Sequence, residues 1–348
     1  MRIPALASML LAACAAPSAP VGVDPGEQGD TGASGGKADG TAPATAVPDV
    51  RCDGTPDAGP AGSFHHFSSR LVAAVGSPRH RGFDLVTGAS ADTQSLEGWI
   101  SYGTIDKALE DEDVDVFACR EGSWTNVGSA RTDTEGHFAL ALDGDARLPI
   151  AMRDLYVSVV GDRTGTSFLG YVAPDDAPLV VSDVDGTLTS SENAFIETLA
   201  LGIEPDAQPG AAVAYQDAAS RGYQLVYVTA RGSQNTDLTR AWLDHQGFPR
   251  GPVRLSPEYL MLSSSTTIAY KTSTISALDA SLPVAMSVGN RASDITAYSN
   301  VGLDPSTIFI KLPEYQKEVQ AALDAGEAIG ITAYDDLRTS YIDALPAR

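Results

Sequence analysis

From about residue 176 onward, short apolar runs alternate with stretches of helical character, and this alternation constrains the fold more than any other feature of the chain. Helices are expected at 210–221, at 236–245 with Gly247 as the cap, and at 273–282. Short buried strands separated by helices are typical of a parallel sheet with helices on both faces. The sequence therefore predicts an α/β domain at 176–348. Its expected strands lie at 179–182, 224–229, 252–255, 284–289 and 307–311.

The region before residue 176 has a different pattern, in which short segments of alternating polar and apolar residues are separated by turn residues. Several short strands at this spacing are typical of an antiparallel β-sandwich, so we expect a small domain of that kind at 63–175. The tetrapeptide Asp133-Thr134-Glu135-Gly136 predicts a hairpin turn between two of the strands. The expected strands lie at 96–102, 114–119, 124–132, 137–142, 155–161 and 166–172.

The first residues have the pattern of a secretion signal. Arg2 is followed by an apolar run at 6–13, which is too short to span a bilayer and ends in Leu-Ala-Ala-Cys. This ending resembles a bacterial lipobox, which implies cleavage of a lipoprotein signal peptide at 1–13 and acylation of Cys14 as a lipid anchor. A plain cleaved signal with an incidental cysteine is the alternative. The expected location is the bacterial cell envelope, anchored in the outer membrane or on the periplasmic face.

Residues 14–62 are rich in Gly, Pro and Ala and contain almost no large apolar side chain, so we expect a disordered tether. Cys52 and Cys119 are the remaining cysteines of the sequence. In an oxidising envelope, the two cysteines either form a disulfide or remain separate thiols, and the sequence leaves both alternatives open. The formal net charge of −22 argues against nucleic acid as a partner, and against attachment to an anionic membrane by charge alone.

Polar residues follow the predicted strands of the α/β domain, at the points where those strands end. Ligands of parallel α/β sheets bind beyond the carboxyl ends of the strands, so these residues are expected to form one cluster. The two carboxylates of Asp183 and Asp185 repel each other, and a cation such as Mg²⁺ would offset that repulsion and take oxygen ligands. The cluster consists of Asp183, Asp185, Thr229, Ala230, Arg231, Lys271, Asn290, Arg291 and Asp294.

Asp-x-Asp followed by Thr, Lys and Asn/Asp in this order resembles the haloacid-dehalogenase-like (HAD) phosphohydrolase superfamily. The resemblance implies a Rossmann-like fold in which Asp183 attacks phosphorus and Asp185 acts as general acid and then as general base. It also implies that Thr229 binds a phosphoryl oxygen and that Lys271 balances negative charge. The metal ligands would be Asp183, Asp185, Asn290 and Asp294. The expected substrate contacts are Gly186, Thr187, Ala230, Arg231 and Arg291.

A narrower resemblance covers about 155–312. D-V-D-G-T-L-T-S-S, V-Y-V-T-A-R, G-P-V-R-L-S-P and G-N-R-A-S-D-I-T-A-Y are similar to the catalytic (LNS) domain of lipins, the Mg²⁺-dependent phosphatidate phosphatases. The same domain closes the membrane-associated phosphatidylinositol transfer proteins, which this chain also resembles in V-V-G-D-R-T and H-Q-G-F-P-R-G. In those transfer proteins the first Asp is lost and the domain is regarded as a phosphatidate-binding module. Asp183 is present here, which favours an active phosphatase over a binding module.

The spacing between the motifs leaves no room for a cap domain over the site. A capless site suits a phosphate presented by a membrane, because small soluble substrates are usually enclosed. Arg231 and Arg291 could bind headgroup oxygens bidentately. We therefore expect a Mg²⁺-dependent phosphatidate phosphatase whose partners are a phospholipid membrane surface and a phosphatidate-like substrate, without nucleic acid. The alternatives are a non-catalytic phosphatidate-binding module and an envelope phosphatase for soluble phosphomonoesters.

Overall fold

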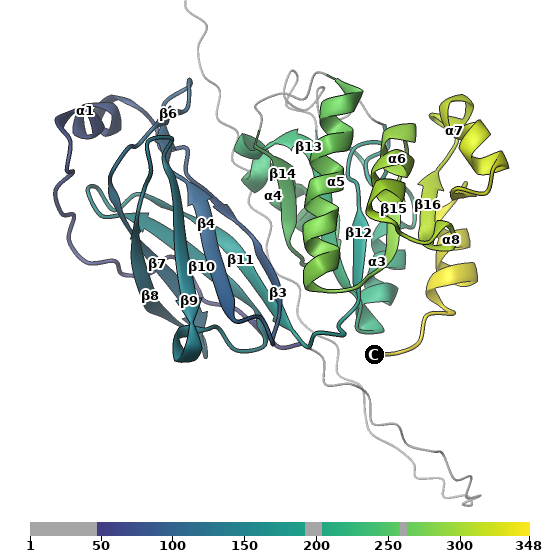
Figure 1. Ribbon diagram of the computed structural model, residues 1–348, viewed down its shortest axis with the longest axis horizontal. Helices are drawn as coiled ribbons and strands as arrows, with labels where there is room; N and C mark the ends of the chain where they lie inside the picture. The colour runs from purple at the N-terminus through teal and green to yellow at the C-terminus, as the bar shows by residue number, and fades with distance from the viewer. Residues whose placement is uncertain (1–46, 192–203, 258–262) are drawn as a thin grey trace, which may run out of the picture. The chain divides into compact units, whose positions relative to one another are not determined.

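The computed structural model describes residues 47–191, 204–257 and 263–348 (Figure 1). The predicted signal peptide at 1–13, the predicted lipid anchor Cys14 and the first part of the predicted tether lie outside the described residues. The described residues form one compact unit, which contains a β-rich half and an α/β half. Within the described ranges, no helix combines the length and the apolar character that crossing a membrane requires.

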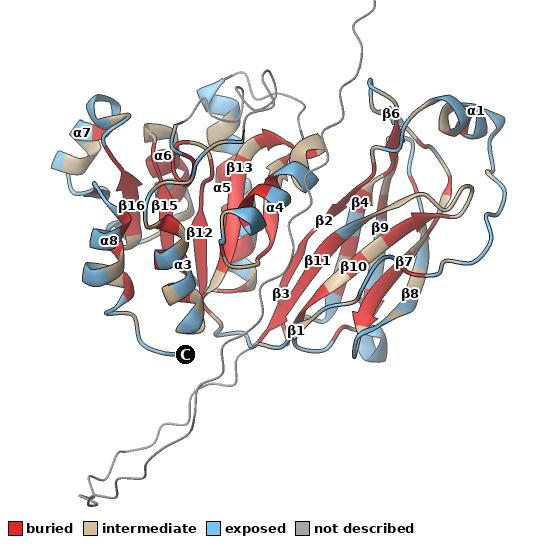
Figure 2. Ribbon diagram, turned by 180° about the vertical axis from the view of Figure 1, so that it is seen from behind, coloured by how far each residue is buried: buried red, intermediate tan, exposed pale blue. Residues whose placement is uncertain are grey.

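The α/β half is built on one parallel sheet with the strand order β14-β13-β12-β15-β16-β17. Its central strands are almost completely buried (Figure 2). Five of the strands were predicted, and β17 was missed because an Ile-Gly-Ile run is too short to stand out from a loop. The strands are β12 (Leu179–Ser182), β13 (Gln224–Gly232), β14 (Val253–Ser256), β15 (Val284–Gly289), β16 (Ile308–Lys311) and β17 (Ile329–Ile331).

Helices cover both faces of this sheet. Val180 and Val181 are successive residues of β12, and they pack into different core layers. The layer around Val180 contains residues of α3, α4 and α8, and the layer around Val181 contains residues of α5, α6 and α7. The α/β fold predicted from the sequence is therefore confirmed. The helices are α3 (Ala211–Ser220), α4 (Thr236–His245), α5 (Ser264–Ser281), α6 (Ala292–Val301), α7 (Gln316–Asp324) and α8 (Tyr334–Leu337).

Helix α5 begins nine residues before the predicted start at residue 273. Ser263 caps it, because its hydroxyl accepts a hydrogen bond from the Thr266 amide at 3.2 Å. The Ser/Thr-rich first turn has no apolar periodicity, which is why the sequence pattern did not reveal it. The extension matters for the site, since it places Lys271 inside a regular helix.

The β-rich half contains two larger sheets, which enclose a core that includes Leu96, Val116, Phe138 and Leu155, and a two-stranded sheet formed by β5 (Ser101–Tyr102) and β6 (Lys107–Ala108). One of the larger sheets has the order β3-β11-β10-β7-β8, and the other has the order β2-β4-β9. The pairs are antiparallel apart from β3 with β11 and β1 with β10. The strands are β1 (Asp49–Val50), β2 (Arg81–Phe83), β3 (Leu85–Gly88), β4 (Thr93–Trp99), β7 (Asp113–Arg120), β8 (Ser123–Arg131), β9 (His137–Asp143), β10 (Ala151–Val159) and β11 (Gly165–Ala173).

The turn predicted at residues 133–136 forms, with the Gly136 amide donating to the Asp133 carbonyl at 3.1 Å. The hairpin prediction is nevertheless wrong, because β8 pairs with β7 whereas β9 pairs with β4. The turn carries the chain from one sheet to the other. Turn chemistry fixes the reversal of the chain but leaves open which strands pair.

The predicted tether does not extend to residue 62. Asp49–Val50 forms β1, which pairs in parallel with the start of β10, and Cys52 forms a disulfide with Cys119 of β7. Backbone hydrogen bonds and one covalent bond order this segment, although it lacks the large apolar side chains that usually do so. The disulfide also settles the choice between paired and separate thiols that the sequence left open.

A buried carboxylate joins the two halves. Asp84 lies between β2 and β3, and its side chain is fully buried. It accepts hydrogen bonds from the amides of Leu169 and Val253, each at 2.7 Å, and from Arg240 of α4 at 2.6 Å. Apolar residues of β3 and β11 also pack in the same cluster as residues of β12 and α5. The β-rich and α/β halves therefore share one of the hydrophobic clusters.

Candidate functional site

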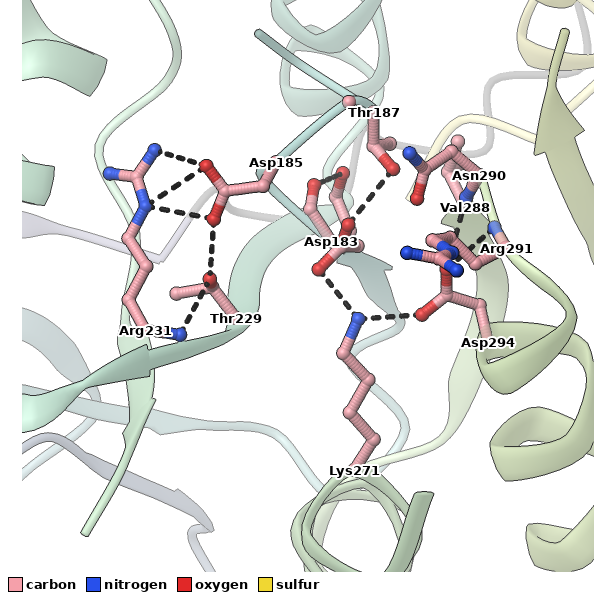
Figure 3. Close-up of polar contacts among 12 residues, drawn as sticks. Asp183, Asp185, Thr187, Thr229, Arg231, Lys271, Val288, Asn290, Arg291 and Asp294 are labelled. Atoms are coloured by element: carbon pink, nitrogen blue, oxygen red, sulfur yellow. Dashed lines mark hydrogen bonds and ion pairs between the residues drawn. The ribbon is translucent and has the colours of Figure 1, made fainter. Parts of the chain in front are cut away.

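The predicted site residues lie at the carboxyl ends of β12, β13 and β15, apart from Lys271 in α5 and Asp294 in the first turn of α6 (Figure 3). Parallel strands end at the same edge of the sheet, which is why residues more than 100 positions apart in the chain lie together. Figure 3 shows two groups. One is centred on Asp183 and Lys271, and the other on Asp185 and Arg231.

Lys271 holds two buried carboxylates. Its Nζ donates to Oδ1 of Asp183 and to Oδ1 of Asp294, each at 2.6 Å, and all three side chains are almost inaccessible to solvent. Burial alone would lower the pKa of Lys271. The charges of Asp183 and Asp294, with their hydrogen bonds, outweigh burial and raise that pKa well above its ordinary value. The lysine is therefore a fixed positive charge between the two carboxylates.

Asp294 is held by the start of α6 as well as by Lys271. Its Oδ2 accepts hydrogen bonds from the amides of Asn290 and Arg291, each at 3.0 Å. A Cβ on Gly289 would lie 2.5 Å from the Cβ of Asp294, so only glycine permits this close approach. The last strand residue and the first helical turn together fix the orientation of the carboxylate.

Asp183 is also held by the loop that follows it. Thr187 Oγ1 donates to Asp183 Oδ2 at 3.0 Å, and the amide of Asp183 donates to the Val288 carbonyl of β15 at 2.9 Å. Gly186 has a φ of 69°, a left-handed conformation that lets the chain turn back after the strand. Its amide donates to Thr189 Oγ1 at 2.8 Å. The loop is thus ordered by its own hydroxyl groups.

Asp185 faces a different partner. Arg231 grips its carboxylate through Nε and Nη2, with Nη2 to Oδ1 at 2.7 Å and Nε to Oδ2 at 2.9 Å. Thr229 Oγ1 donates to the same carboxylate at 3.2 Å. Two contacts from one planar guanidinium define the carboxylate's orientation as well as its position. This group contains Asp185, Thr229 and Arg231, but neither of the other two carboxylates.

The expectation that Asp183, Asp185 and Asp294 converge on one metal ion is not met. Arg231 turns the carboxylate of Asp185 away from the other two. Within the described ranges, no three His, Cys, Asp or Glu side chains are placed to share an ion. Asp183 and Asp294 are hard oxygen donors that already face one cationic group, and Asn290 directly follows β15 and carries a side-chain amide oxygen. Asp183, Asp294 and Asn290 thus offer oxygen ligands, which are the ligands that a cation such as Mg²⁺ prefers.

Two predicted substrate contacts are placed differently from the rest. Arg291 donates to Glu318 of α7, with Nη2 to Oε2 at 3.1 Å, and its guanidinium lies 4.1 Å from the ring centre of Tyr315. These contacts direct it toward α7. Ala230 lies on β13 between Thr229 and Arg231 and carries only a methyl group, so it can bind a ligand through its backbone alone.

Sequence reasoning missed Thr239 of α4, which is fully buried. Its Oγ1 accepts a hydrogen bond from Nη1 of Arg231 at 3.1 Å, so it orients the guanidinium that grips Asp185. It also missed Tyr215 of α3, whose hydroxyl donates to Ser182 Oγ at 2.8 Å beneath the site. Both residues lie inside amphipathic helices, where a single polar residue on the buried face is the only sequence feature that could have revealed them.

Comparison with known proteins divides the chain at the same place as the fold. Residues 180–311 match the family model of the LNS2 domain of PITM 1-3, and residues 78–172 match that of the PITM 1-3 beta-sandwich domain. Membrane-associated phosphatidylinositol transfer protein 3 of Homo sapiens is 26% identical over 74% of this chain and 26% of its own length.

Two further relatives have names that specify an activity. Phosphatidic acid phosphohydrolase 1 of Saccharomyces cerevisiae is 29% identical over 53% of this chain and 25% of its own length. Phosphatidate phosphatase LPIN3 of Mus musculus is 31% identical over 40% of this chain and 18% of its own length. The chain spans no more than about a quarter of these relatives. Residues 180–311 are therefore similar to the LNS2 domain of PITM 1-3, and parts of the chain are similar to these two phosphatidate phosphatases.

Proposed function

We propose that the protein is a Mg²⁺-dependent phosphomonoesterase that hydrolyses phosphatidate, or a related phospholipid phosphomonoester, at a membrane surface. The observation that carries this proposal is Asp183, a buried carboxylate at the end of β12 that Lys271 and Thr187 hold in one orientation. The names of the yeast and mouse relatives support the choice of phosphatidate. In this proposal Asp183, Asn290 and Asp294 would hold Mg²⁺, which would offset negative charge on the phosphoryl oxygens.

The first chemical step is attack by an Asp183 carboxylate oxygen on phosphorus. The bond between phosphorus and the leaving oxygen breaks, and the phosphoryl group becomes an acyl phosphate on Asp183. Lys271 balances the charge of the nucleophile throughout. Thr229 is positioned to donate its hydroxyl hydrogen to a phosphoryl oxygen once it leaves Asp185.

Asp185 supplies and removes the proton. In the structure the carboxylate of Asp185 is ion-paired with Arg231. The phosphoryl oxygens of the substrate must therefore replace this carboxylate as the partner of the guanidinium. Once Asp185 is released from Arg231 it takes up a proton from solvent, and it then donates that proton to the leaving oxygen as the bond from that oxygen to phosphorus breaks. It then takes a proton from the water that attacks phosphorus, the bond from phosphorus to Asp183 breaks, and inorganic phosphate leaves. Arg231 is therefore both the partner of Asp185 before substrate binds and a ligand of the substrate afterwards.

The test is release of inorganic phosphate from phosphatidate vesicles and from a soluble aryl phosphate, each with Mg²⁺ or with a chelator. We expect release from vesicles only with Mg²⁺, and faster than from the soluble ester. Asp183→Asn should abolish turnover while the protein remains folded, because the amide cannot form the acyl phosphate. Wild-type turnover by Asp183→Asn would show that this residue is not the nucleophile. Hydrolysis of the soluble ester alone would favour an envelope phosphatase for soluble substrates.

A second function, phosphatidate binding without catalysis, is favoured by one observation: both matching family models describe PITM 1-3 domains. A cation that binds only the folded protein stabilises it by about 2.7 kcal/mol at a hundredfold excess over its Kd. Mg²⁺ should therefore raise the melting temperature of an enzyme, and Asp294→Ala should remove both that rise and turnover. Vesicle binding that survives chelation, with no phosphate released under any condition, would establish the binding function instead.

The proposed location is the cell envelope, with the protein held by an acylated Cys14. Support comes from the Leu-Ala-Ala-Cys stretch, because acylation of Cys14 would add a hydrophobic anchor. Cys14→Ser should lower the share of the protein in the membrane fraction of fractionated cells. Acyl-free Cys14→Ser protein that stays as firmly in the membrane fraction as the wild type would rule out the anchor.

A further inference from the structure

Helix α1 (Phe67–Val75) has an apolar face that points away from the protein. Positions 67, 71 and 75 are four residues apart, so they lie along one side of the helix. Phe67, Leu71 and Val75 are 78%, 54% and 80% exposed. Val72 and Ala73 lie on the other side and pack against the core of the β-rich half. The helix is thus apolar on both sides, and only one side is buried.

Another exposed apolar residue lies beside this helix. Ile105, which is 84% exposed, lies in the turn between β5 (Ser101–Tyr102) and β6 (Lys107–Ala108). The chain just after α1 holds that turn, because the Gly103 amide donates to the Ser77 carbonyl at 2.8 Å. Both ribbon views show α1 next to β6 (Figures 1 and 2). We call Phe67, Leu71, Val75 and Ile105 the apolar tip.

The apolar tip is a concentration of exposed apolar surface. Seven large apolar side chains are exposed among the described residues, and four of them belong to the tip. Single exposed apolar residues are normal on protein surfaces, whereas a group of them marks an interaction site. The tip therefore has the composition of a docking surface.

Two exposed cations lie at the tip of a chain that is acidic overall, and one exposed carboxylate, Glu110, follows β6. Acidic residues outnumber Lys and Arg by 45 to 23 in the chain, yet α1 contains none. Arg70 on α1 and Lys107 beside the turn are exposed, and neither forms an ion pair within the described part of the chain. Asp106, next to Ile105, is offset by Arg81 at 2.8 Å. Uncompensated cations therefore border the exposed apolar side chains.

The start of α1 is fixed to the β-rich half. The buried carboxylate of Glu112 accepts hydrogen bonds from the amides of His65 and His66, at 2.8 and 3.0 Å. After the helix, Pro78 and Arg79 line a cavity of about 290 Å³ together with Ser233 and other residues that follow Arg231. The helix is thus a fixed element, and the chain leaving it reaches the loop next to the candidate site.

We propose that the apolar tip docks onto a lipid bilayer that carries anionic headgroups. Its four apolar side chains enter the boundary between headgroups and acyl chains, and Arg70 and Lys107 lie at the level of the lipid phosphates. The charges favour this partner, because a purely apolar protein surface would gain nothing from the two cations. The negative remainder of the molecule is repelled by the same surface, which restricts contact to this end. The proposal rests on the proposed function only in placing the protein at a membrane.

The test is co-sedimentation with vesicles, using the full chain with Cys14→Ser so that no acyl chain contributes. Phosphatidylcholine vesicles with and without phosphatidylglycerol are the probes. We expect Phe67→Ser, Leu71→Ser and Val75→Ser combined to lower partitioning onto the anionic vesicles at least tenfold, with an unchanged melting temperature. Arg70→Gln should weaken binding only when phosphatidylglycerol is present. Val213→Ser, which changes an exposed valine of α3, is the matched control and should bind as before.

Equal vesicle binding by the triple variant and by Val213→Ser would overturn the proposal. So would self-association in solution that the triple variant abolishes without any vesicle binding, because a second copy of the chain would then occupy the tip. Hydrolysis of a soluble aryl phosphate should be the same in the triple variant and the parent. Co-sedimentation measures vesicle binding even if neither protein hydrolyses that ester. Failure of the docking proposal can therefore be distinguished from failure of the proposed catalysis.

Discussion

At the scale of single residues, the site depends on the charge of Lys271. Its ammonium is the common partner of two carboxylates that have almost no contact with water. Removing one member of a buried ion pair leaves the other charge uncompensated, which typically costs about 3–5 kcal/mol. Lys271 therefore determines stability as well as the state of the proposed nucleophile.

We predict that Lys271→Met lowers the free energy of unfolding by about 3–5 kcal/mol at pH 8. The folded protein raises the pKa of Lys271 above its ordinary 10.5, so the stabilisation is complete below pH 10.5 and is lost as the pH rises further. The difference between variant and wild type should thus narrow above pH 10.5. Denaturant unfolding across this pH range measures it, with exposed Lys317→Met as the control. A constant difference up to pH 12 would contradict the assigned charge.

A second residue, His80, makes the folded protein less stable in acid. Burial lowers the pKa of His80 to about 4, with Arg81 acting in the same direction and Asp162 against it. The imidazole is therefore neutral in the folded protein, while the unfolded chain takes up a proton below pH 6.5. The wild type should lose about 3 kcal/mol of stability between pH 6.5 and pH 4 through this group. His80→Gln should show a correspondingly shallower loss in denaturant titrations, and identical pH profiles would refute the assignment.

The sequence was sufficient to predict which residues form the site, but not the direction in which each side chain points. Asp183, Thr229, Lys271 and Asp294 were expected together because strand ends of a parallel sheet share one edge. Asp185 follows Asp183 by two positions. Nothing in the neighbouring sequence indicates that the guanidinium of Arg231, 46 residues further along the chain, binds the carboxylate of Asp185. A side chain's direction depends on its tertiary partner, and tertiary partners are not encoded in spacing.

At the scale of elements, α4 connects the site to the β-rich half through two consecutive residues. Thr239 accepts from Arg231, which grips Asp185, and Arg240 donates to the buried carboxylate of Asp84. One helix thus carries a contact to the proposed general acid and a contact to the neighbouring sheets. Displacement of α4 would alter both.

We predict that Thr239→Val lowers kcat/KM on phosphatidate about tenfold. The loss of one hydrogen bond to a charged group is worth about 1.5–3 kcal/mol, and here it removes one of the contacts that orient the guanidinium of Arg231. Thr239→Ser keeps the hydroxyl and should restore most of the activity. The measurement is the kcat and KM of each variant on phosphatidate vesicles. Equal losses in the Val and Ser variants would attribute the effect to packing.

Most elements were predictable because their apolar patterns are regular, as in β12 and β15. The misassigned elements had other determinants. The start of α5 depends on a serine cap, β17 depends on pairing with β16, and the partners of β8 and β9 depend on the packing of two sheets. Caps and pairings are tertiary or local polar effects that hydrophobic periodicity does not record.

At the scale of the whole molecule, the two halves cannot be treated as independent modules. Val86 and Tyr171 of the β-rich half are buried in the same cluster as Leu179 and Leu278 of the α/β half. Asp84 binds backbone groups on both sides of the junction. The sequence predicted two domains from their patterns, but a shared hydrophobic cluster depends on which apolar faces meet, and the patterns do not contain that information.

We predict that Asp84→Ala lowers the free energy of unfolding by about 3 kcal/mol or more. Two buried amides and Arg240 would lose their acceptor, and each buried unsatisfied group costs about 1–3 kcal/mol. Thermal unfolding should remain a single transition at a lower temperature, because the halves share a hydrophobic cluster. Asp324→Ala, at an exposed position of α7, serves as the control. Two separate transitions in the variant would show that the halves are independently stable.

The disulfide between Cys52 and Cys119 also has a mechanical consequence. A force applied between residue 47 and the C-terminus would first separate β1 from β10 and then pass through the S–S bond into β7. The 67 positions spanned by that bond, which include α1 and β2 to β6, would bear no load while it is intact. Single-molecule stretching of the reduced protein should therefore release about 230 Å more chain than stretching of the oxidised protein, at about 3.4 Å per residue. Equal extensions would mean that the load does not travel through the disulfide.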